Sequence, residues 1–297
     1  MKKRKVRDRL ATLILLLVLI GGLALFLFRV LPNYLNARTQ SQAAIRYAER
    51  VAAMDDDDYQ AALDAALDYN AALYTTDLLW TMTDAQRDGY AAALDVDGLG
   101  CMAVIDIPAL GVTLPVYHGG VEAAEQAYVT HMEGTSLPVG VRYVELDDSL
   151  RAPEFGASCI LSDHRSLLST RLFNHLDRLA EGDRFTLRVL DETLTYEVDD
   201  VSVIEPGTLY AQTIGPGRDD VILMTDTPRG TGNHLLLVRG RRVENGTPVS
   251  ARVPGDGVRI SRELVAPFVA VPALAVLLIW ILIALSGAAL RRRSRGQ

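Results

Sequence analysis

The stretch VILMTDTPRGTGNHLLLVRG, from Val221 to Gly240, predicts two β-strands joined by a glycine-rich turn. The first strand is apolar until it ends in a carboxylate at Asp226, and a lone histidine, His234, opens the second strand. Burying a charged group is costly, so a carboxylate at the end of an otherwise apolar strand needs an explanation. Whether the chain is an enzyme therefore depends on what Asp226 does there.

The chain around this stretch alternates short apolar runs with Gly, Pro and Asp turns. Seven runs predict β-strands: MAVIDIP (102–108), GVTLPVYHG (111–119), ASCILSDH (157–164), RFTLRVL (184–190), ETLTYEVDDVSVIEP (192–206), DDVILMT (219–225) and HLLLVRGRRVE (234–244). Seven or eight strands with few short helices predict a mainly β protein, in which residues 101–245 form a closed, antiparallel-rich barrel.

Helical patterns occur before and between the strands. Residues 36–74 predict two helices that are broken at MDDDDY (54–59), where the acids suit the first turn of the second helix. The segment 121–140 predicts a short helix and a loop, and STRLFNHLDRL (169–179) predicts an amphipathic helix. Four histidines are predicted to lie on the surface or in turns: His118, His131, His175 and His234.

Charge is distributed unevenly along the 297 residues. The basic tails 1–9 and 291–297 hold ten of the 30 Lys and Arg residues but only one of the 37 acidic residues. The remaining chain is strongly acidic, which argues against nucleic-acid binding and suits an exported domain.

Two long apolar runs, Leu10–Phe28 and Leu264–Leu290, predict membrane-spanning helices. Basic residues flank their outer ends, so the positive-inside rule places both termini in the cytoplasm and the core domain outside the cell membrane. A cleaved signal peptide is the alternative for the first run. The predicted order is a basic tail (1–9), a membrane helix (10–31), an extracellular helical region with a lid-like loop at 75–84 (32–100), the barrel (101–245), a tether (246–262), a second membrane helix (263–290) and a basic tail (291–297).

The two cysteines, Cys101 and Cys159, both lie in apolar, strand-like stretches. A disulfide is one alternative in an exported domain, but the pattern favours buried free thiols.

Several stretches together resemble one family, the class C sortases of Gram-positive bacteria, which are membrane-anchored enzymes that polymerise pilins. The stretches that carry the resemblance are IDIPALGVTLPVYHG (105–119), HMEGTSLPVG (131–140), ILSDHRSL (160–167) and TDTPRGTGNHLLLVRGRR (225–242). The resemblance implies a sortase-like barrel and a cysteine transpeptidase mechanism. In that mechanism a cysteine takes the acyl group of a sorting signal, a histidine transfers protons, an arginine steadies the oxyanion, and an amine of another pilin accepts the acyl group.

The family's catalytic positions are occupied unusually in this chain. The resemblance assigns the histidine position to His164, the cysteine position to Asp226 and the arginine position to Leu235. In the lid-like loop, Asp77 and Trp80 keep only the outline of the family's motif. Ser162 and Asp163 replace its usual Thr-Gly before the histidine, and Arg229, in the turn, is a candidate substitute for the missing arginine.

A carboxylate cannot simply replace the thiolate, because its attack on an amide would have to expel a much more basic amine. Cys159, five residues before His164, is an alternative nucleophile, although a packed core thiol is the simpler interpretation. Asp226 and His164 are expected to form an ion pair, whereas a metal site that also uses Asp163 is disfavoured because adjacent strand residues face opposite ways. We expect no cofactor and no metal.

Two hypotheses follow for the function. The first is a pseudoenzyme of pilus or surface-protein assembly that binds pilins, sorting signals or an active sortase. The second is an active peptidase or transpeptidase with altered chemistry, in which Asp226 acts as a base on water and His164 as an acid.

Overall fold

The computed structural model describes residues 20–22, 39–75, 82–119, 129–140, 143–147, 150–153, 157–163, 173, 175–212, 218–226 and 234–245. Asn36–Gly255 form one compact unit, and Met1–Leu35 with Asp256–Gln297 form another. None of the helices in the described ranges is long and apolar enough to cross a membrane. The predicted membrane helices, 10–31 and 263–290, lie outside the described residues apart from 20–22.

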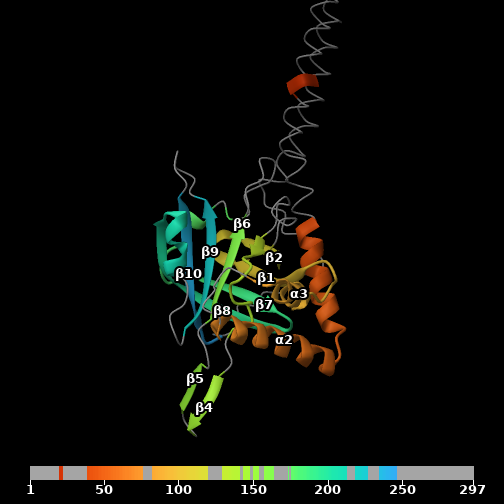
Figure 1. Cartoon of the computed structure of the whole chain (residues 1–297). Coiled ribbons are helices and arrows are strands. Elements are labelled where there is room, and N and C mark those ends of the chain that lie inside the picture. The colour runs from red at the N-terminus through yellow and green to blue at the C-terminus, as the bar shows by residue number, and fades with distance from the viewer. Residues whose placement is uncertain are drawn as a thin grey trace, which may run out of the picture. The chain divides into compact units, whose positions relative to one another are not determined.

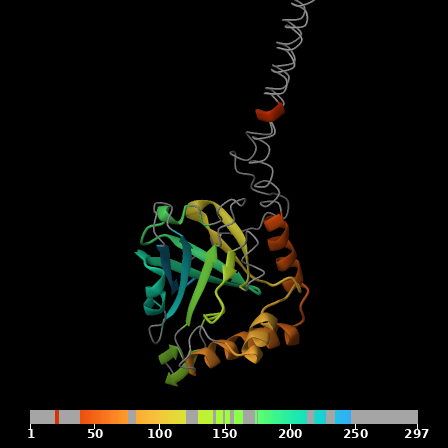
Figure 2. The same ribbon diagram turned by 45° about the horizontal axis from the view of Figure 1, so that its top comes forward.

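Eight strands close into a barrel in the order β1-β2-β3-β6-β9-β10-β8-β7 (Figures 1 and 2). Their bounds are β1 Cys101–Ile107, β2 Val112–His118, β3 Val129–His131, β6 Ala157–Asp163, β7 Arg184–Val189, β8 Glu192–Ile204, β9 Asp219–Asp226 and β10 Leu235–Val243. All neighbouring pairs are antiparallel except β2 with β3 and β6 with β9. The predicted mainly β, closed and antiparallel-rich barrel is therefore confirmed.

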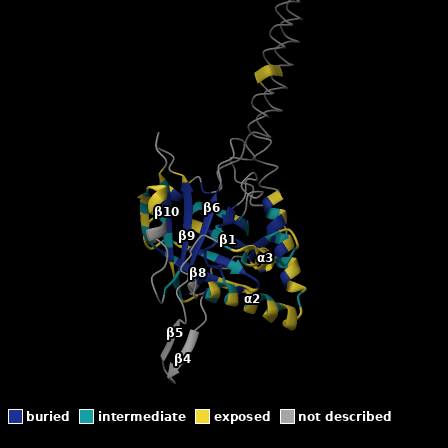
Figure 3. Ribbon diagram, in the orientation of Figure 1, coloured by how far each residue is buried: buried dark blue, intermediate teal, exposed yellow. Residues whose placement is uncertain are grey.

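The apolar residues of the strands fill the barrel. In β7, buried residues alternate with more exposed ones, as expected for a strand with one face on the core. In β9, the six residues from Asp220 to Thr225 are all buried, so both of its faces are covered. In Figure 3 the barrel strands are largely buried, whereas the outer faces of the helices are exposed.

Two elements depart from the expected pattern. The segment predicted as a helix and a loop contains strand β3, which is too short to show alternation and pairs with β2 and β6. A hairpin of β4 Tyr143–Asp147 and β5 Leu150–Pro153 forms a separate two-stranded sheet that extends from the barrel (Figure 1). The sequence did not predict this hairpin.

The predicted amphipathic helix at 169–179 is wrong within the described residues, where only the short 3-10 helix η3, Leu176–Arg178, forms. The apolar side of the pattern is nevertheless buried, at Phe173, Leu176 and Leu179. Two further 3-10 helices are η1, Pro108–Leu110, and η4, Pro206–Gln212.

The two helices predicted within residues 36–74 form where the sequence predicts them. A helix over residues 39–52 is followed by α2, Asp56–Thr75, so the break at MDDDDY is confirmed. Three aspartates occupy the first turn of α2, and the backbone N–H of Asp58 donates to Asp55 Oδ1 at 2.8 Å. A third helix, α3, Asp84–Ala92, was not predicted from the sequence; it begins with a capping box between Thr83 and Gln86.

These helices pack directly on the barrel. The Tyr47 hydroxyl donates to Met102 O of β1 at 2.9 Å and accepts the N–H of Leu190 at 2.8 Å. On α2, Asn70 accepts the N–H of Leu137 at 2.6 Å and donates to Leu137 O at 3.1 Å. Together with Tyr90 of α3, these residues join the helices and the barrel in one hydrophobic core.

Candidate functional site

Asp226 and Leu235 face each other at one end of the barrel. β9 and β10 run antiparallel, and in their register Leu235 is the direct cross-strand partner of Asp226. Cα atoms of such partners lie about 4.5–5.5 Å apart, so the two side chains stand side by side on the same face. Asp226 is exposed, whereas Thr225 before it is buried. The apolar strand therefore ends in a carboxylate because the chain leaves the core at this point.

The end of β6 meets the same end of the barrel, because β6 and β9 are parallel neighbours with Ser162 opposite Met224. Asp163 is the last residue of β6 and is buried; its Oδ2 accepts the N–H of Phe173 at 3.2 Å. The next residue in the chain is His164, which lies outside the described residues. Asp77, Trp80 and Arg229 also lie outside them, so the site can be described only at Asp226 and Leu235.

An apolar surface adjoins Asp226. We call it the outer apolar cluster; it consists of buried Ile160, Ile222, Met224 and Leu237 and of partly buried Met132, Ile204, Leu209 and Leu235. Ile222 and Met224 alternate with Asp226 along β9, so all three lie on one face of the sheet. This cluster is separate from the barrel core and leads directly to the carboxylate.

Sequence reasoning missed this cluster as part of the site. Leu209 in η4 and Met132 after β3 approach it from distant parts of the sequence. The available signal was the uninterrupted run VILM, because an uninterrupted apolar run indicates a strand that is covered on both faces.

Neither cysteine can serve as an accessible nucleophile in this structure. Cys101 and Cys159 are free thiols and both are buried, as the sequence favoured. Burial raises the pKa of Cys101 to about 12 and raises the pKa of Cys159 well above its usual value. A thiol is reactive only as the thiolate, so Cys159 is an inert core residue here.

The prediction for the four histidines is wrong at His131, which is fully buried in β3. His175 and His234 are exposed, and His118 is half-buried. Within the described ranges, no group of three or more His, Cys, Asp or Glu side chains is arranged to hold a metal ion.

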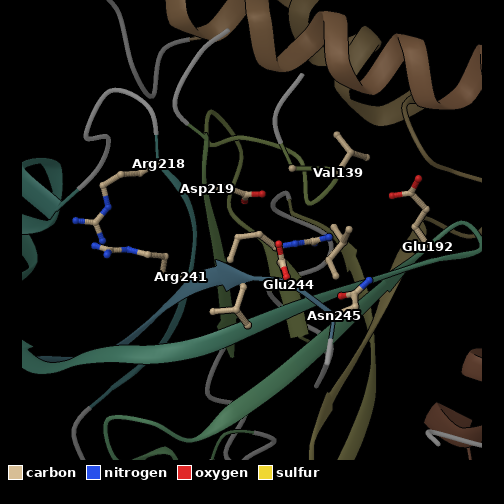
Figure 4. A pocket seen from close by; sticks show the side chains of 11 residues that line it. Val139, Glu192, Arg218, Asp219, Arg241, Glu244 and Asn245 are labelled. Carbon is tan, nitrogen blue, oxygen red and sulfur yellow. The ribbon is translucent and has the colours of Figure 1, made fainter. Parts of the chain in front are cut away.

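A cavity of about 740 Å³ lies at the other end of the barrel (Figure 4). Residues at the start of β9 and at the end of β10 line it, among them Asp219, Arg242 and Glu244. Burial raises the pKa of Asp219 to about 6, although Arg242 and a hydrogen bond from the Tyr196 hydroxyl at 3.3 Å oppose the shift. Because Asp219 and Asp226 are the two ends of β9, roughly 20 Å separates this cavity from the site.

Comparisons with known proteins agree with this architecture. The sortase domain family matches residues 105–243. Sortase C1 from Streptococcus agalactiae has a TM-score of 0.61 and 39% identity, over 69% of this chain and 100% of that chain. Sortase C-1 from Actinomyces oris has a TM-score of 0.51 and 35% identity, over 62% of this chain and 98% of that chain.

Sortase C from Clostridium perfringens, solved with the C-terminal cell wall sorting motif, has a TM-score of 0.55 and 26% identity, over 68% of this chain and 98% of that chain. A comparison with curated protein sequences found no match. A barrel with β6, β9 and β10 meeting at one apolar end, together with these similarities, places the chain in the sortase family. More closely, its fold is of the class C kind, the sortases of pilus assembly.

Proposed function

We propose that this protein is a membrane-anchored accessory protein of pilus or surface-protein assembly, which binds sorting signals without working as a cysteine transpeptidase. The observation that carries the proposal is the pair Asp226 and Leu235 at the ends of β9 and β10. The resemblance assigns these positions to the nucleophile and the oxyanion-stabilising arginine, and neither side chain can perform the family's step.

The chemistry of the two side chains supports an inactive site. A carboxylate at position 226 would have to form an anhydride from an unactivated amide, which is strongly uphill. Leucine at position 235 offers no hydrogen-bond donor to a developing oxyanion, and the loss of one such donor typically costs about 10²–10³ in rate. The buried thiols Cys101 and Cys159 supply no replacement nucleophile.

The outer apolar cluster supports retained binding. Its partly buried members, among them Ile204, Leu209 and Leu235, offer apolar area beside Asp226. Apolar contact of this kind does not require a nucleophile, so the site can hold a peptide after the transpeptidase chemistry has been lost. A sorting motif of the kind solved with the Clostridium perfringens enzyme is the proposed ligand, and an active sortase is a second proposed partner.

Membrane anchoring by the segments 10–31 and 263–290, with both termini in the cytoplasm, is part of the proposal. The motivating observation is the pair of apolar runs flanked by basic tails. Proteolysis of intact cells tests it: an added protease should degrade the core and leave epitopes at both termini protected. Loss of either epitope would contradict the two-span arrangement.

The decisive experiment uses the full chain with a fluorescent sorting-motif peptide. The unaltered protein should bind the peptide and release no product, and the double variant Asp226→Cys, Leu235→Arg should gain cleavage. Cys159→Ala in the unaltered background is the control and should leave binding unchanged. If the unaltered protein cleaves the peptide and Asp226→Ala abolishes the cleavage, the altered chemistry with Asp226 and His164 replaces this proposal. A covalent acyl adduct on the unaltered protein would also contradict it.

A further inference from the structure

Strand β8 extends beyond its neighbour on one side. β7 pairs with β8 only from Glu192 to Glu197, and the turn before β7 adds hydrogen bonds to Val198 at 2.8 and 2.9 Å. β10, on the other side, pairs with β8 as far as Ile204. Among the described residues, no backbone pairs with the β7-facing edge of β8 beyond Val198. Within the part of the chain that the structure describes, the last part of β8 is therefore a sheet edge.

The backbone groups on this side of β8 that pair with none of the described residues belong to Val201 and Val203. Val198 directs both its N–H and its C=O toward the β7 side, and its side chain faces the barrel core. In a β-strand of L-residues, side-chain faces and N–H directions alternate together. Two residues of one strand whose side chains lie on the same face therefore point their N–H groups to the same edge. Val201 and Val203 are cross-strand partners of the buried core residues Val238 and Leu236, so they share the core-facing side and direct their backbone groups to the free edge.

The register between β8 and β10 contains a β-bulge between Arg239 and Gly240. Because of this bulge, Val198 and the odd-numbered residues Val201 and Val203 direct their backbone groups to the same edge. Gly240 is opposite Val198 while Arg239 is opposite Asp200, so Asp199 is an extra residue that shifts the alternation by one position. Three arginines, Arg218, Arg239 and Arg241, hold the Asp199 carboxylate at 3.1, 2.7 and 3.3 Å. The bulge is thereby fixed, and the edge beyond it has a defined orientation.

The side chains at this edge are exposed as well. Val201 is 36% exposed and Val203 is 58% exposed, although both belong to the core-facing side of β8. An edge that offers main-chain donors and acceptors together with alternate β-branched side chains is the arrangement that accepts an added strand.

Charge distinguishes between possible occupants of the edge. Glu205 follows the strand directly and is exposed, and the chain between the two basic tails is strongly acidic. A second copy of the chain would bring two acidic cores together, which is unfavourable. An extended segment with a lysine placed against Glu205 would instead gain an opposite charge.

We propose that the edge of β8 at Val201 and Val203 is a strand-addition site for an extended, lysine-bearing segment of another protein. Ile204, Leu235 and Asp226 are successive cross-strand partners in β8, β10 and β9. An added strand therefore lies about 14 Å, or three strand spacings, from Asp226. The inference goes beyond the proposed function, because it involves neither Asp226 nor the outer apolar cluster.

Hydrogen exchange on the full chain tests the site. The probe is a synthetic peptide in which valine alternates with threonine and a lysine stands at one end. Its addition should slow the exchange of the Val201 and Val203 amides by about tenfold or more. The same peptide with N-methylated valines is the matched control and should not bind, because it cannot form the main-chain pairs.

Variants of exposed positions separate the edge from nonspecific apolar binding. Val203→Lys should weaken the affinity for the peptide about tenfold, because it removes an apolar contact and sets like charges together. Leu99→Lys changes an equally exposed side chain, at 60%, that lies before β1, and should have no effect. Glu205→Lys should weaken binding of the lysine peptide but not of the same peptide ending in glutamate.

Three results would overturn the inference: no protection at Val201 and Val203, equal effects of Val203→Lys and Leu99→Lys, or protection that appears without peptide as the chain dimerises. Binding of the sorting-motif peptide is measured in the same samples. It should be unaffected by Val203→Lys, so failure of the strand-addition site and failure of the proposed function give different results.

Discussion

His131 is held in its neutral form by the hydrogen bonds around it. Its Nε2 lies 2.8 Å from Ser136 O and must therefore carry the proton, while Nδ1, at 3.0 Å, is left to accept from the Tyr90 hydroxyl. That hydroxyl also accepts the N–H of Gly119 at 2.9 Å. Complete burial lowers the pKa of His131 to about 3, and the nearby His118 adds to the shift while the bond to Ser136 opposes it.

Tyr90→Phe should destabilise the fold by about 1–3 kcal/mol, because it leaves the Gly119 N–H and His131 Nδ1 without their partner in a buried place. Equilibrium unfolding in urea measures this. Tyr59→Phe, which changes a more exposed tyrosine, is the control and should cost less. Equal losses for the two variants would show that the Tyr90 hydroxyl has no special role.

His131 should also make stability fall on acidification. Its pKa in the folded protein is lower than the usual value of 6.5, so its contribution is complete above pH 6.5 and is lost as the pH falls toward 3. The loss should reach about 2 kcal/mol by pH 5. Unfolding of the unaltered chain and of His131→Gln at several pH values measures it: the stability advantage of the unaltered chain should shrink with acid. A constant difference would contradict the buried neutral ring.

Sequence alone could not predict this role for His131. A lone histidine in a polar stretch suggests the surface, and its burial depends on α3 and on the loop to Ser136. Asp226 was easier to place, because a carboxylate that ends an apolar run marks the end of a buried strand. The resemblance singled out Leu235, but its pairing with Asp226 is seen only in the structure, and Met132 and Leu209 reach the same surface only through tertiary packing.

At the scale of elements, strands β7 to β10 were predictable because each carries several apolar residues between clear turns. β3 was not, because three residues show no period, and its stability as a strand comes from its two neighbours. Long strands were therefore easier to predict than short ones, because a longer segment shows more of the apolar pattern.

Strand β10 crosses the core at Gly240, where a methyl group would not fit. A Cβ there would lie 2.5 Å from Phe185 Cε1 and 3.1 Å from Tyr196 Cβ, in a place where the two rings are stacked 5.5 Å apart. Gly240→Ala should therefore destabilise the barrel by about 1–3 kcal/mol. Gly89→Ala, in α3 with nothing within 4 Å, should stabilise it by about 0.5–1 kcal/mol. Thermal unfolding measures both, and a shift in the same direction for the two variants would contradict this account.

At the scale of the whole molecule, the helices before the barrel are part of its core. Sequence periodicity predicted the two helices within residues 36–74 but not α3, and it could not predict what their apolar sides face. Tyr47, Ala66 and Tyr90 belong to the same cluster as the strands β1 and β7, and Asn70 makes paired hydrogen bonds with Leu137. The helical layer therefore covers one side of the barrel and contributes side chains to its core.

Removing that layer should abolish cooperative folding. A chain that covers Asn36–Gly255 keeps the compact unit and should melt in one transition. A chain that begins at Gly100 exposes Met102 and Val104, which are fully buried in the structure. Because a small domain that loses part of its core has too little buried apolar area, this shorter chain should bind a hydrophobic dye and show no sharp melting transition. Calorimetry of the two chains measures this, and a cooperative transition in the shorter chain would show that the barrel folds without its helices.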